Sequence, residues 1–157
     1  MYPPIPQRRA RVLAALKGGA AVVFAGGSSQ PLLGPWIADS NFQYLTGLDD
    51  EPEGAVLFDP SAEDERRRAV LFLKPLNRET ERWDGYREEI GSGLRARTGF
   101  RTVMRTTSLA ALLTDAARRT KRLACLHPFA VYDAAVSPDL CVYRKVAERV
   151  PGVAIED

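Results

Sequence analysis

The sequence predicts an α/β fold: a single layered domain in which a mixed β-sheet carries helices on both faces. Three observations support this fold class. Short apolar runs of strand length alternate along the chain with longer segments of helical periodicity. Two of the apolar runs are joined only by a charged loop, which predicts an antiparallel hairpin within the sheet. The length of 157 residues suits one domain with a sizeable core, so we assign residues 1–157 to one domain.

The first predicted helix starts near Pro6 and ends at Gly18-Gly19. Its apolar residues recur at helical spacing, which places Val12 and Leu16 on one face. The run 20–25 follows directly. It is apolar throughout and contains β-branched residues, so we expect a strand that is buried on both faces.

A short helix is predicted over residues 40–47, after a loop rich in Gly, Ser and Pro. Asp39 and Ser40 are both suited to cap its first turn, because their side-chain oxygens can accept hydrogen bonds from backbone amides. Gly47 is suited to end the helix, because glycine adopts the left-handed backbone that helix ends require.

The runs 55–58 and 69–73 are predicted strands of the hairpin, and the charged loop 59–68 joins them. A mainly helical and charged segment, 78–97, comes next. Three glycines are expected to break this segment: Gly85, Gly91 and Gly93.

Two further helices and three further strands complete the prediction. One helix is capped by Ser108 and buries Leu109, Leu112, Leu113 and Ala116. The other begins at Ser137-Pro138-Asp139, ends at Pro151-Gly152 and buries a stripe of Val142, Val146 and Val150. The predicted strands are 101–104, 122–126 and a last one that begins near residue 153.

Composition and charge exclude two classes of partner. The net charge is only +2, and the basic residues alternate with acidic ones, as in 63–68, so we expect no nucleic-acid surface. The apolar runs are far too short to cross a bilayer, so we expect no membrane association. The two cysteines, Cys125 and Cys141, are widely spaced. We expect reduced thiols and a cytoplasmic location.

The residues alone show no self-sufficient catalytic group. A hydrolytic metal site needs several convergent ligands, whereas the chain has one histidine, His127, which we interpret as structural. Ser92 between two glycines does not match a nucleophile elbow, and Gly26-Gly27 lacks the residues of a phosphate loop. We therefore expect no catalytic residue, metal ligand or bound cofactor in this chain. On this basis alone, the sequence indicates a soluble α/β domain with a binding or structural role.

Aromatic residues carry the remaining signal. Trp36, Phe42 and Tyr44 cluster in sequence around Asp39, and for Phe42 and Tyr44 we favour packing in the core. Trp83 lies in a charged, glycine-containing segment, so two readings stay equally open for it: packing in the core, or a place at an interface or the rim of a pocket, which suits a large amphipathic ring.

Four motifs occur in a fixed order along the chain. They are Ser40 to Gly47, Glu51-Pro52-Glu53-Gly54, Leu71-Phe72, and Glu81 to Gly85 with Trp83 at its centre. Because it has these motifs in this order, the chain resembles the N-terminal domain of aminopeptidase P. That family is the Xaa-Pro aminopeptidase branch of the creatinase/prolidase metallopeptidases. The resemblance runs from Arg8-Arg9 to about Val150. It departs from the family pattern at Ile37, where relatives often carry an arginine.

The resemblance implies a function for a longer parent enzyme. Such enzymes release an N-terminal residue that precedes proline, using two divalent metals, commonly manganese, in a C-terminal pita-bread domain that we expect to be absent from this chain. The N-terminal domain would shape the substrate entrance and support a homo-oligomer. Its partners would be its own C-terminal domain and the proline-containing peptide.

Four residues are the candidates for the substrate entrance or for contacts between subunits: Trp83, Tyr44, Asp39 and Trp36. Motif position implies for Trp83 a place near a neighbouring subunit's active site. Two alternatives stay open at this stage. One is a stand-alone, non-enzymatic binding module of the same fold, and the other is the N-terminal domain of a prolidase-type dipeptidase.

Overall fold

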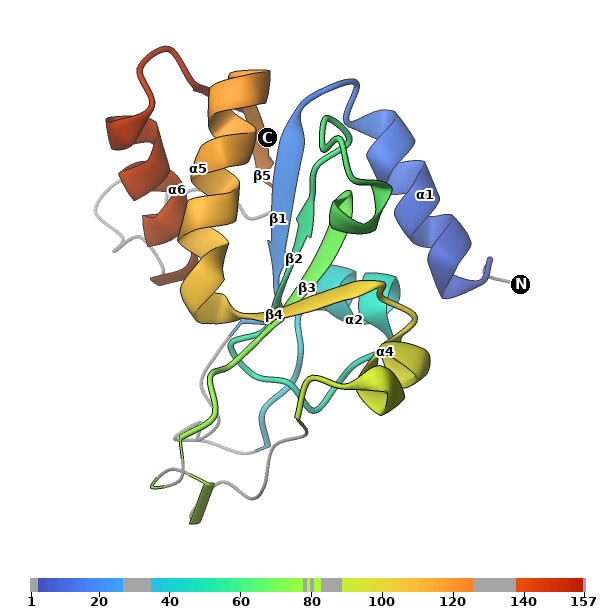
Figure 1. Ribbon diagram of the computed structural model, residues 1–157. Coiled ribbons are helices and arrows are strands. Elements are labelled where there is room, and N and C mark those ends of the chain that lie inside the picture. The colour runs from blue at the N-terminus through green and yellow to red at the C-terminus, as the bar shows by residue number, and fades with distance from the viewer. Residues whose placement is uncertain are drawn as a thin grey trace.

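The structure, a computed structural model, describes residues 3–26, 35–77, 79, 81–82, 89–125 and 138–156. Within these residues six strands form one sheet, and helices cover both of its faces (Figure 1). The strands are β1 Ala20–Phe24, β2 Ala55–Phe58, β3 Ala69–Leu73, β4 Thr102–Arg105, β5 Arg122–Cys125 and β6 Ala154–Glu156. The helices are α1 Ile5–Ala15, α2 Ser40–Thr46, α4 Ser92–Thr98, α5 Leu109–Thr120 and α6 Pro138–Arg149, with 3₁₀ turns η1 Glu65–Arg67 and η2 Thr106–Ser108. This architecture confirms the predicted mixed sheet between helical layers.

The sheet has the strand order β4-β3-β2-β1-β5-β6 and contains both kinds of pairing. The three central neighbours β1, β2 and β3 pair antiparallel, with Val22 opposite Leu57 and Leu57 opposite Val70. The outer strands β4, β5 and β6 are each parallel to their inner neighbour. The hairpin β2–β3 and the last strand β6 are therefore where the sequence predicts them.

Strand alternation divides the core into two layers. One face of the sheet presents Val22, Leu57 and Phe72 to α5 and α6, which Figure 1 shows together on one side of the sheet. Leu113 and Tyr143 come from these helices, and both are fully buried. The predicted valine stripe of α6 is confirmed, because Val146 and Val150 are buried and Val142 packs against the same layer.

The opposite face presents Val23, Val56 and Leu71 to a second layer, formed by α1, α2 and α4. Phe42 from α2 and Leu94 from α4 are almost fully buried there. The predicted apolar face of the first helix packs on this layer through Val12, Leu13 and Leu16. Because alternate residues of β1 serve the two layers, the whole strand is buried, as the continuous apolar run predicts.

Two local expectations are wrong. Gly93 does not break a helix but lies in the first turn of α4, where the burial of Leu94 holds the helix in place. Ser108 precedes α5 as predicted, yet its side chain makes no capping hydrogen bond, because the residue belongs to the 3₁₀ turn η2 and has a helical backbone. Gly91 precedes the first residue of α4 and is confirmed as a break, whereas Gly85 lies outside the described residues.

Candidate functional site

The candidate site is built on the segment that leaves β1 and forms α2. Asp39 caps this helix, since its carboxylate accepts hydrogen bonds from the amides of Asn41 at 2.9 Å and Phe42 at 3.1 Å. The Asp39 amide donates to the carbonyl of Ala25 at 2.9 Å, which ties the helix start to the end of β1. Of the two predicted caps, the structure selects Asp39.

Trp36 is anchored to the same place. Its indole Nε1 donates to the carbonyl of Gly26 at 3.0 Å, so Trp36 and Asp39 are both held by the chain just after β1. Ile37 lies between these two anchored residues, and 82% of its surface is exposed. The structure therefore presents Ile37 as an exposed apolar side chain on a well-held backbone. Ile37 is not one of the four predicted candidates. Its place between Trp36 and Asp39, two of those candidates, is the signal by which the sequence could have identified it.

Tyr44 does not belong to the core, and the prediction of core packing is wrong for this residue. It is 39% exposed, whereas Phe42 is fully buried as predicted. The Arg8 guanidinium of α1 lies over the Tyr44 ring, with its carbon 4.4 Å from the ring centroid, and Arg8 Nη1 donates to the Tyr44 carbonyl at 2.8 Å. Tyr44 thus faces α1. Trp83, the fourth candidate, lies outside the described residues, as does His127.

The rest of the α2 motif holds the fold. Thr46 is buried, and its hydroxyl donates to the carbonyl of Phe42 at 2.7 Å. Gly47 ends the helix with φ of 73°, a backbone that favours glycine, and a Cβ there would lie 2.8 Å from the Cδ1 of Ile5. Thr46 therefore serves packing, and Gly47 serves the direction of the chain.

The second motif, 51–54, also serves the fold. A Cβ on Gly54 would lie 2.9 Å from the Glu51 carbonyl oxygen and 3.2 Å from Cζ of Phe42. The Gly54 carbonyl accepts from the Ala25 amide at 2.8 Å, which places the motif beside the end of β1. The glycine therefore allows the chain to pass close to α2.

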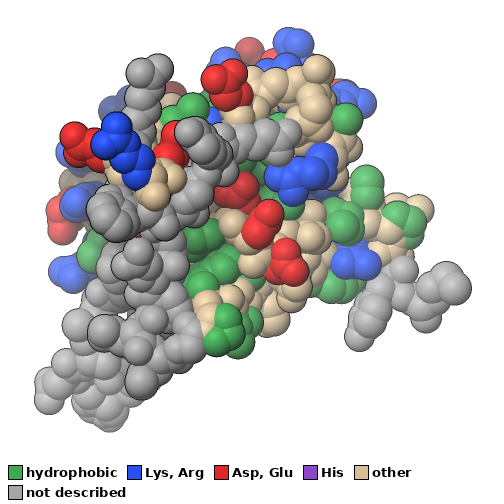
Figure 2. Space-filling view, turned by 90° about the horizontal axis from the view of Figure 1, so that it is seen from below, with side chains coloured by type: hydrophobic (Ala, Val, Ile, Leu, Met, Phe, Trp, Pro, Cys, Tyr) green, Lys and Arg blue, Asp and Glu red, His purple; other side chains and the backbone are tan. Residues whose placement is uncertain are grey.

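Figure 2 shows the molecule from below, the end of the sheet at which Figure 1 places α2 and α4. Hydrophobic and acidic side chains lie next to each other on this face. Exposed Asp49 and Asp50 follow α2 in the chain, and exposed Ile37 precedes it. Within the described ranges, no three His, Cys, Asp or Glu side chains come together in a way that could hold a metal ion.

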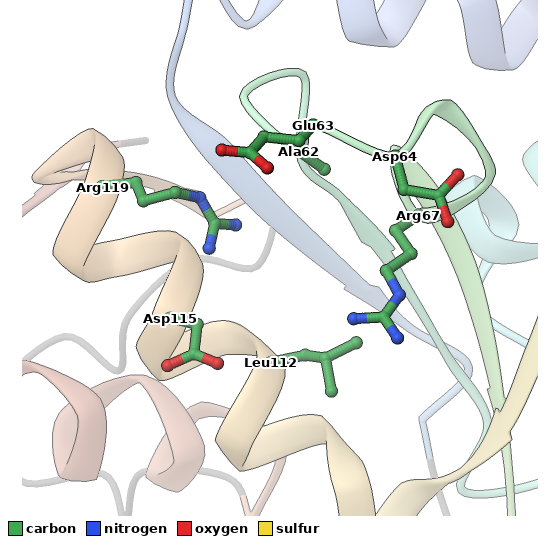
Figure 3. Close-up of a pocket in the computed structure, with 7 residues that line it drawn as sticks. All are labelled: Ala62, Glu63, Asp64, Arg67, Leu112, Asp115 and Arg119. Carbon is green, nitrogen blue, oxygen red and sulfur yellow. The ribbon is translucent and has the colours of Figure 1, made fainter.

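An open pocket on another part of the surface, of about 370 Å³, lies between α5 and the loop of the hairpin β2–β3 (Figure 3). Arg119 and Asp115 reach it from α5, and Arg67 reaches it from the loop side. Arg119 pairs with the buried carboxylate of Asp59, which also accepts from the Ser61 amide at 3.0 Å. This ion pair holds the loop against α5, so a structural role accounts for it.

Comparison with protein-family models gives a match over residues 5–124 to the model described as "Aminopeptidase P, N-terminal domain". The match covers well over half of the chain. The chain belongs to the aminopeptidase P N-terminal domain family.

Solved structures agree on the fold of this aminopeptidase P N-terminal domain. A Bacillus anthracis protein identified provisionally as aminopeptidase P has a TM-score of 0.75 and 20% identity, over 98% of this chain and 37% of that one. A histidine-to-alanine variant of Escherichia coli aminopeptidase P has a TM-score of 0.73 and 17% identity, over 98% and 36%. The aminopeptidase PepP of Pseudomonas aeruginosa has a TM-score of 0.64 and 24% identity, over 93% and 32%. The chain thus spans about a third of the length of these proteins.

A search of curated proteins found no match. No helix in the described part of the chain is both long enough and apolar enough to cross a membrane. The family model establishes the family of this aminopeptidase P N-terminal domain, and the solved structures establish its fold.

The cap of α2 gives a first prediction for the aminopeptidase P N-terminal domain. Replacing Asp39 with alanine is expected to lower the free energy of unfolding by about 0.5–2 kcal/mol, because two amides of the first turn lose their acceptor. Urea denaturation of the 157-residue chain measures the change. Asp49→Ala, at an exposed acid just after the same helix, is the control and should change stability by less than about 0.5 kcal/mol. Equal effects of the two substitutions would contradict the capping role.

Proposed function

We propose that this chain is the non-catalytic N-terminal domain of an Xaa-Pro aminopeptidase-type metallopeptidase. It shapes the substrate entrance of a cytoplasmic enzyme that releases an N-terminal residue preceding proline. The membership of the aminopeptidase P N-terminal domain family carries this proposal. A prolidase-type parent would share the fold and differ in the length of peptide that it cleaves.

The surface at α2 supports a contact with another protein surface. Ile37 is 82% exposed, while the hydrogen bonds of Trp36 and Asp39 hold the backbone on either side of it. An exposed apolar side chain on a fixed backbone loses little conformational entropy on burial, so it suits a docking contact. In the proposed enzyme, Ile37 and Trp36 lie at the border with the C-terminal domain or with the peptide.

The two divalent metals of the proposed enzyme, manganese by family resemblance, do not fit the described part of this chain. No three potential ligands converge there, and a catalytic metal site requires about three protein ligands. We therefore place both metals in a C-terminal domain, and no chemical step is assigned to the described residues.

Oligomerisation is part of the same proposal. Homo-oligomers most often form by two-fold pairing, and we expect a homodimer or tetramer in which the N-terminal domains contribute part of the contact. Trp83 is the residue that we place nearest to a neighbouring subunit's active site, on the strength of its motif position.

Kinetics on an Xaa-Pro peptide with added manganese test the proposal. The 157-residue chain alone should show no turnover above a manganese-only blank. In the full-length enzyme, Ile37→Ser and Trp83→Ala should each lower kcat/KM by about 5–10-fold, the loss typical of a contributing interface residue. Both variants should keep the stability of the domain nearly unchanged.

Arg118→Ser on α5 is the control, because this exposed residue lies on the opposite side of the sheet and should leave kcat/KM unaltered. Turnover by the chain alone would overturn the claim that it is catalytically silent. If Trp83→Ala costs about 3–5 kcal/mol of domain stability, as for a buried aromatic, Trp83 is a core residue and its assignment to the entrance is wrong. Unchanged kinetics for both variants would remove this face from the substrate entrance and favour a binding module.

A further inference from the structure

Arg9 is the most unusual charged residue in the described structure, because it is buried and has no acidic partner there. Only 6% of its surface is exposed. Its guanidinium lies 3.9 Å from the centroid of the Phe100 ring, and its two Nη atoms donate to the carbonyls of Thr98 at 3.5 Å and Gly99 at 3.1 Å. A guanidinium has five N–H donors, so these contacts leave part of its hydrogen-bonding capacity unused.

Buried charges in proteins are normally paired. The two carbonyls at the end of α4 offset part of the Arg9 charge, since the C-terminal end of a helix is partially negative. They do not replace a carboxylate, and burial lowers the pKa of the Arg9 guanidinium because desolvation penalises its charged form. An anion beside Arg9 would reverse this penalty.

The space beside Arg9 is an open pocket of about 450 Å³ between α1, η1 and the start of β4. Its charged lining is four arginines and a single glutamate: Arg9, Arg66, Arg68, Arg101 and Glu65. The remainder is mostly apolar, with Pro6, Ala10, Leu13, Ala69 and Phe100. A positive rim over an apolar floor fits a ligand that has anionic groups on a carbon skeleton.

Not all of these arginines are equally available. Arg66 pairs with Asp64 at 3.1 Å, and this hydrogen bond lowers the pKa of Asp64. Arg68 lies 3.5 Å from the Glu65 carboxylate. Arg101 is exposed and makes no hydrogen bond or ion pair with the described residues. Arg9 and Arg101 therefore supply the positive charge that no carboxylate of the described chain neutralises.

We propose that this pocket binds a small organic polyanion, a molecule with two or more carboxylate or phosphate groups on a short carbon skeleton. One anionic group lies beside the unused donors of Arg9, and another pairs with Arg101. The volume of the pocket exceeds what a single phosphate ion fills, and the apolar floor covers the carbon skeleton. Binding joins α1 to β4 and α4, so the ligand stabilises the packing of the first helix on the sheet.

Calorimetry and thermal unfolding of the 157-residue chain test the proposal, with citrate as the tricarboxylate probe and glycerol 3-phosphate as the phosphate probe. Ionic strength is matched with potassium chloride, because chloride screening alone changes the stability of charged proteins. At least one probe should bind and raise Tm above the chloride control. The tighter of the two probes identifies the anionic group that the pocket prefers.

Arg101→Ala should weaken binding by about 10-fold or more, as for the loss of a hydrogen bond to a charged group. It should leave the ligand-free Tm unchanged, because Arg101 is exposed. Arg67→Ala is the matched control, since Arg67 is next to Arg66 and Arg68 in sequence but lines the pocket on α5 (Figure 3). The control should change affinity by less than about 2-fold.

Two outcomes would overturn the proposal. One is that neither citrate nor glycerol 3-phosphate has any effect beyond that of matched chloride. The other is that Arg67→Ala weakens binding as much as Arg101→Ala, which would indicate general attraction to a positive surface. Arg9→Met provides a further measurement: a folded variant that still binds citrate with unchanged affinity would exclude Arg9 from the site.

Discussion

Replacing Tyr143 with alanine is expected to lower the free energy of unfolding by about 3–5 kcal/mol, the cost of deleting a fully buried large aromatic side chain. Tyr143 is 0% exposed and lies in the layer between α5, α6 and the sheet. Its ring contacts Phe24 edge to face, with 6.2 Å between the centroids. The cavity left by alanine would therefore open in the centre of this layer.

The hydroxyl of Tyr143 has a separate role that a second substitution measures. The Val22 amide donates to this oxygen at 2.6 Å, and the hydroxyl donates to the carbonyl of Ala124 at 2.8 Å. The side chain thus bridges β1 and β5 where the two strands are paired in parallel. Tyr143→Phe keeps the ring but leaves the buried Val22 amide and the partly buried Ala124 carbonyl without this partner, which should cost about 1–3 kcal/mol.

Urea denaturation with an unchanged m-value checks both substitutions, because a constant m-value shows that only stability has changed. Val142→Ala, at the neighbouring and less buried position of α6, is the control and should cost less than Tyr143→Ala. A Tyr143→Phe variant as stable as the wild type would show that water or another group satisfies Val22 and Ala124. The hydroxyl bridge between β1 and β5 would then contribute nothing to the stability of the domain.

The elements of this fold were predictable where local pattern and core packing agree. The runs that became β1, β2 and β3 are apolar throughout and rich in strand-forming residues, which favours strands buried on both faces. The cap of α2 was predictable because Asp39 acts on amides two and three residues away. Such signals are contained in a few consecutive residues.

Arg9 and Tyr143 show why other features were not predictable. An arginine in an amphipathic helix is ordinarily exposed, and the burial of Arg9 depends on Thr98 and Gly99, about ninety positions later in the chain. The stripe of α6 was predicted from its valines, while the most buried of the described side chains of that helix is a tyrosine, whose hydroxyl bonds to two strands. Contacts between distant segments decide both cases.

The candidate site was predictable in part. Trp36 and Asp39 do lie together, but the exposure of Ile37 depends on how the chain leaves β1. Tyr44 is 39% exposed and its ring lies against Arg8 of α1, a contact that the pattern of α2 alone does not contain. The place of Trp83 stays a prediction, as does its role at a subunit contact.

The α2 motif gives the second large prediction, since two of its aromatic residues should behave oppositely. Phe42→Ala is expected to lower the free energy of unfolding by about 3–5 kcal/mol. The ring is 0% exposed and lies close to Gly54, which has no side chain that could fill the cavity left by alanine. Small domains have only about 5–15 kcal/mol of stability, so this substitution should remove a large part of it.

Tyr44→Ala, two residues further along the same short helix, is the matched control. It removes a ring that is 39% exposed and a contact with the Arg8 guanidinium, so it should cost only about 0.5–1 kcal/mol. Denaturant midpoints of the two variants separate the roles within one motif. If both substitutions cost the same small amount, α2 is not docked through Phe42, and the aromatic motif would owe its pattern to a binding surface. If Phe42→Ala alone is severe, the buried half of the motif maintains the fold and the exposed half, with Ile37, is left for contacts with a partner.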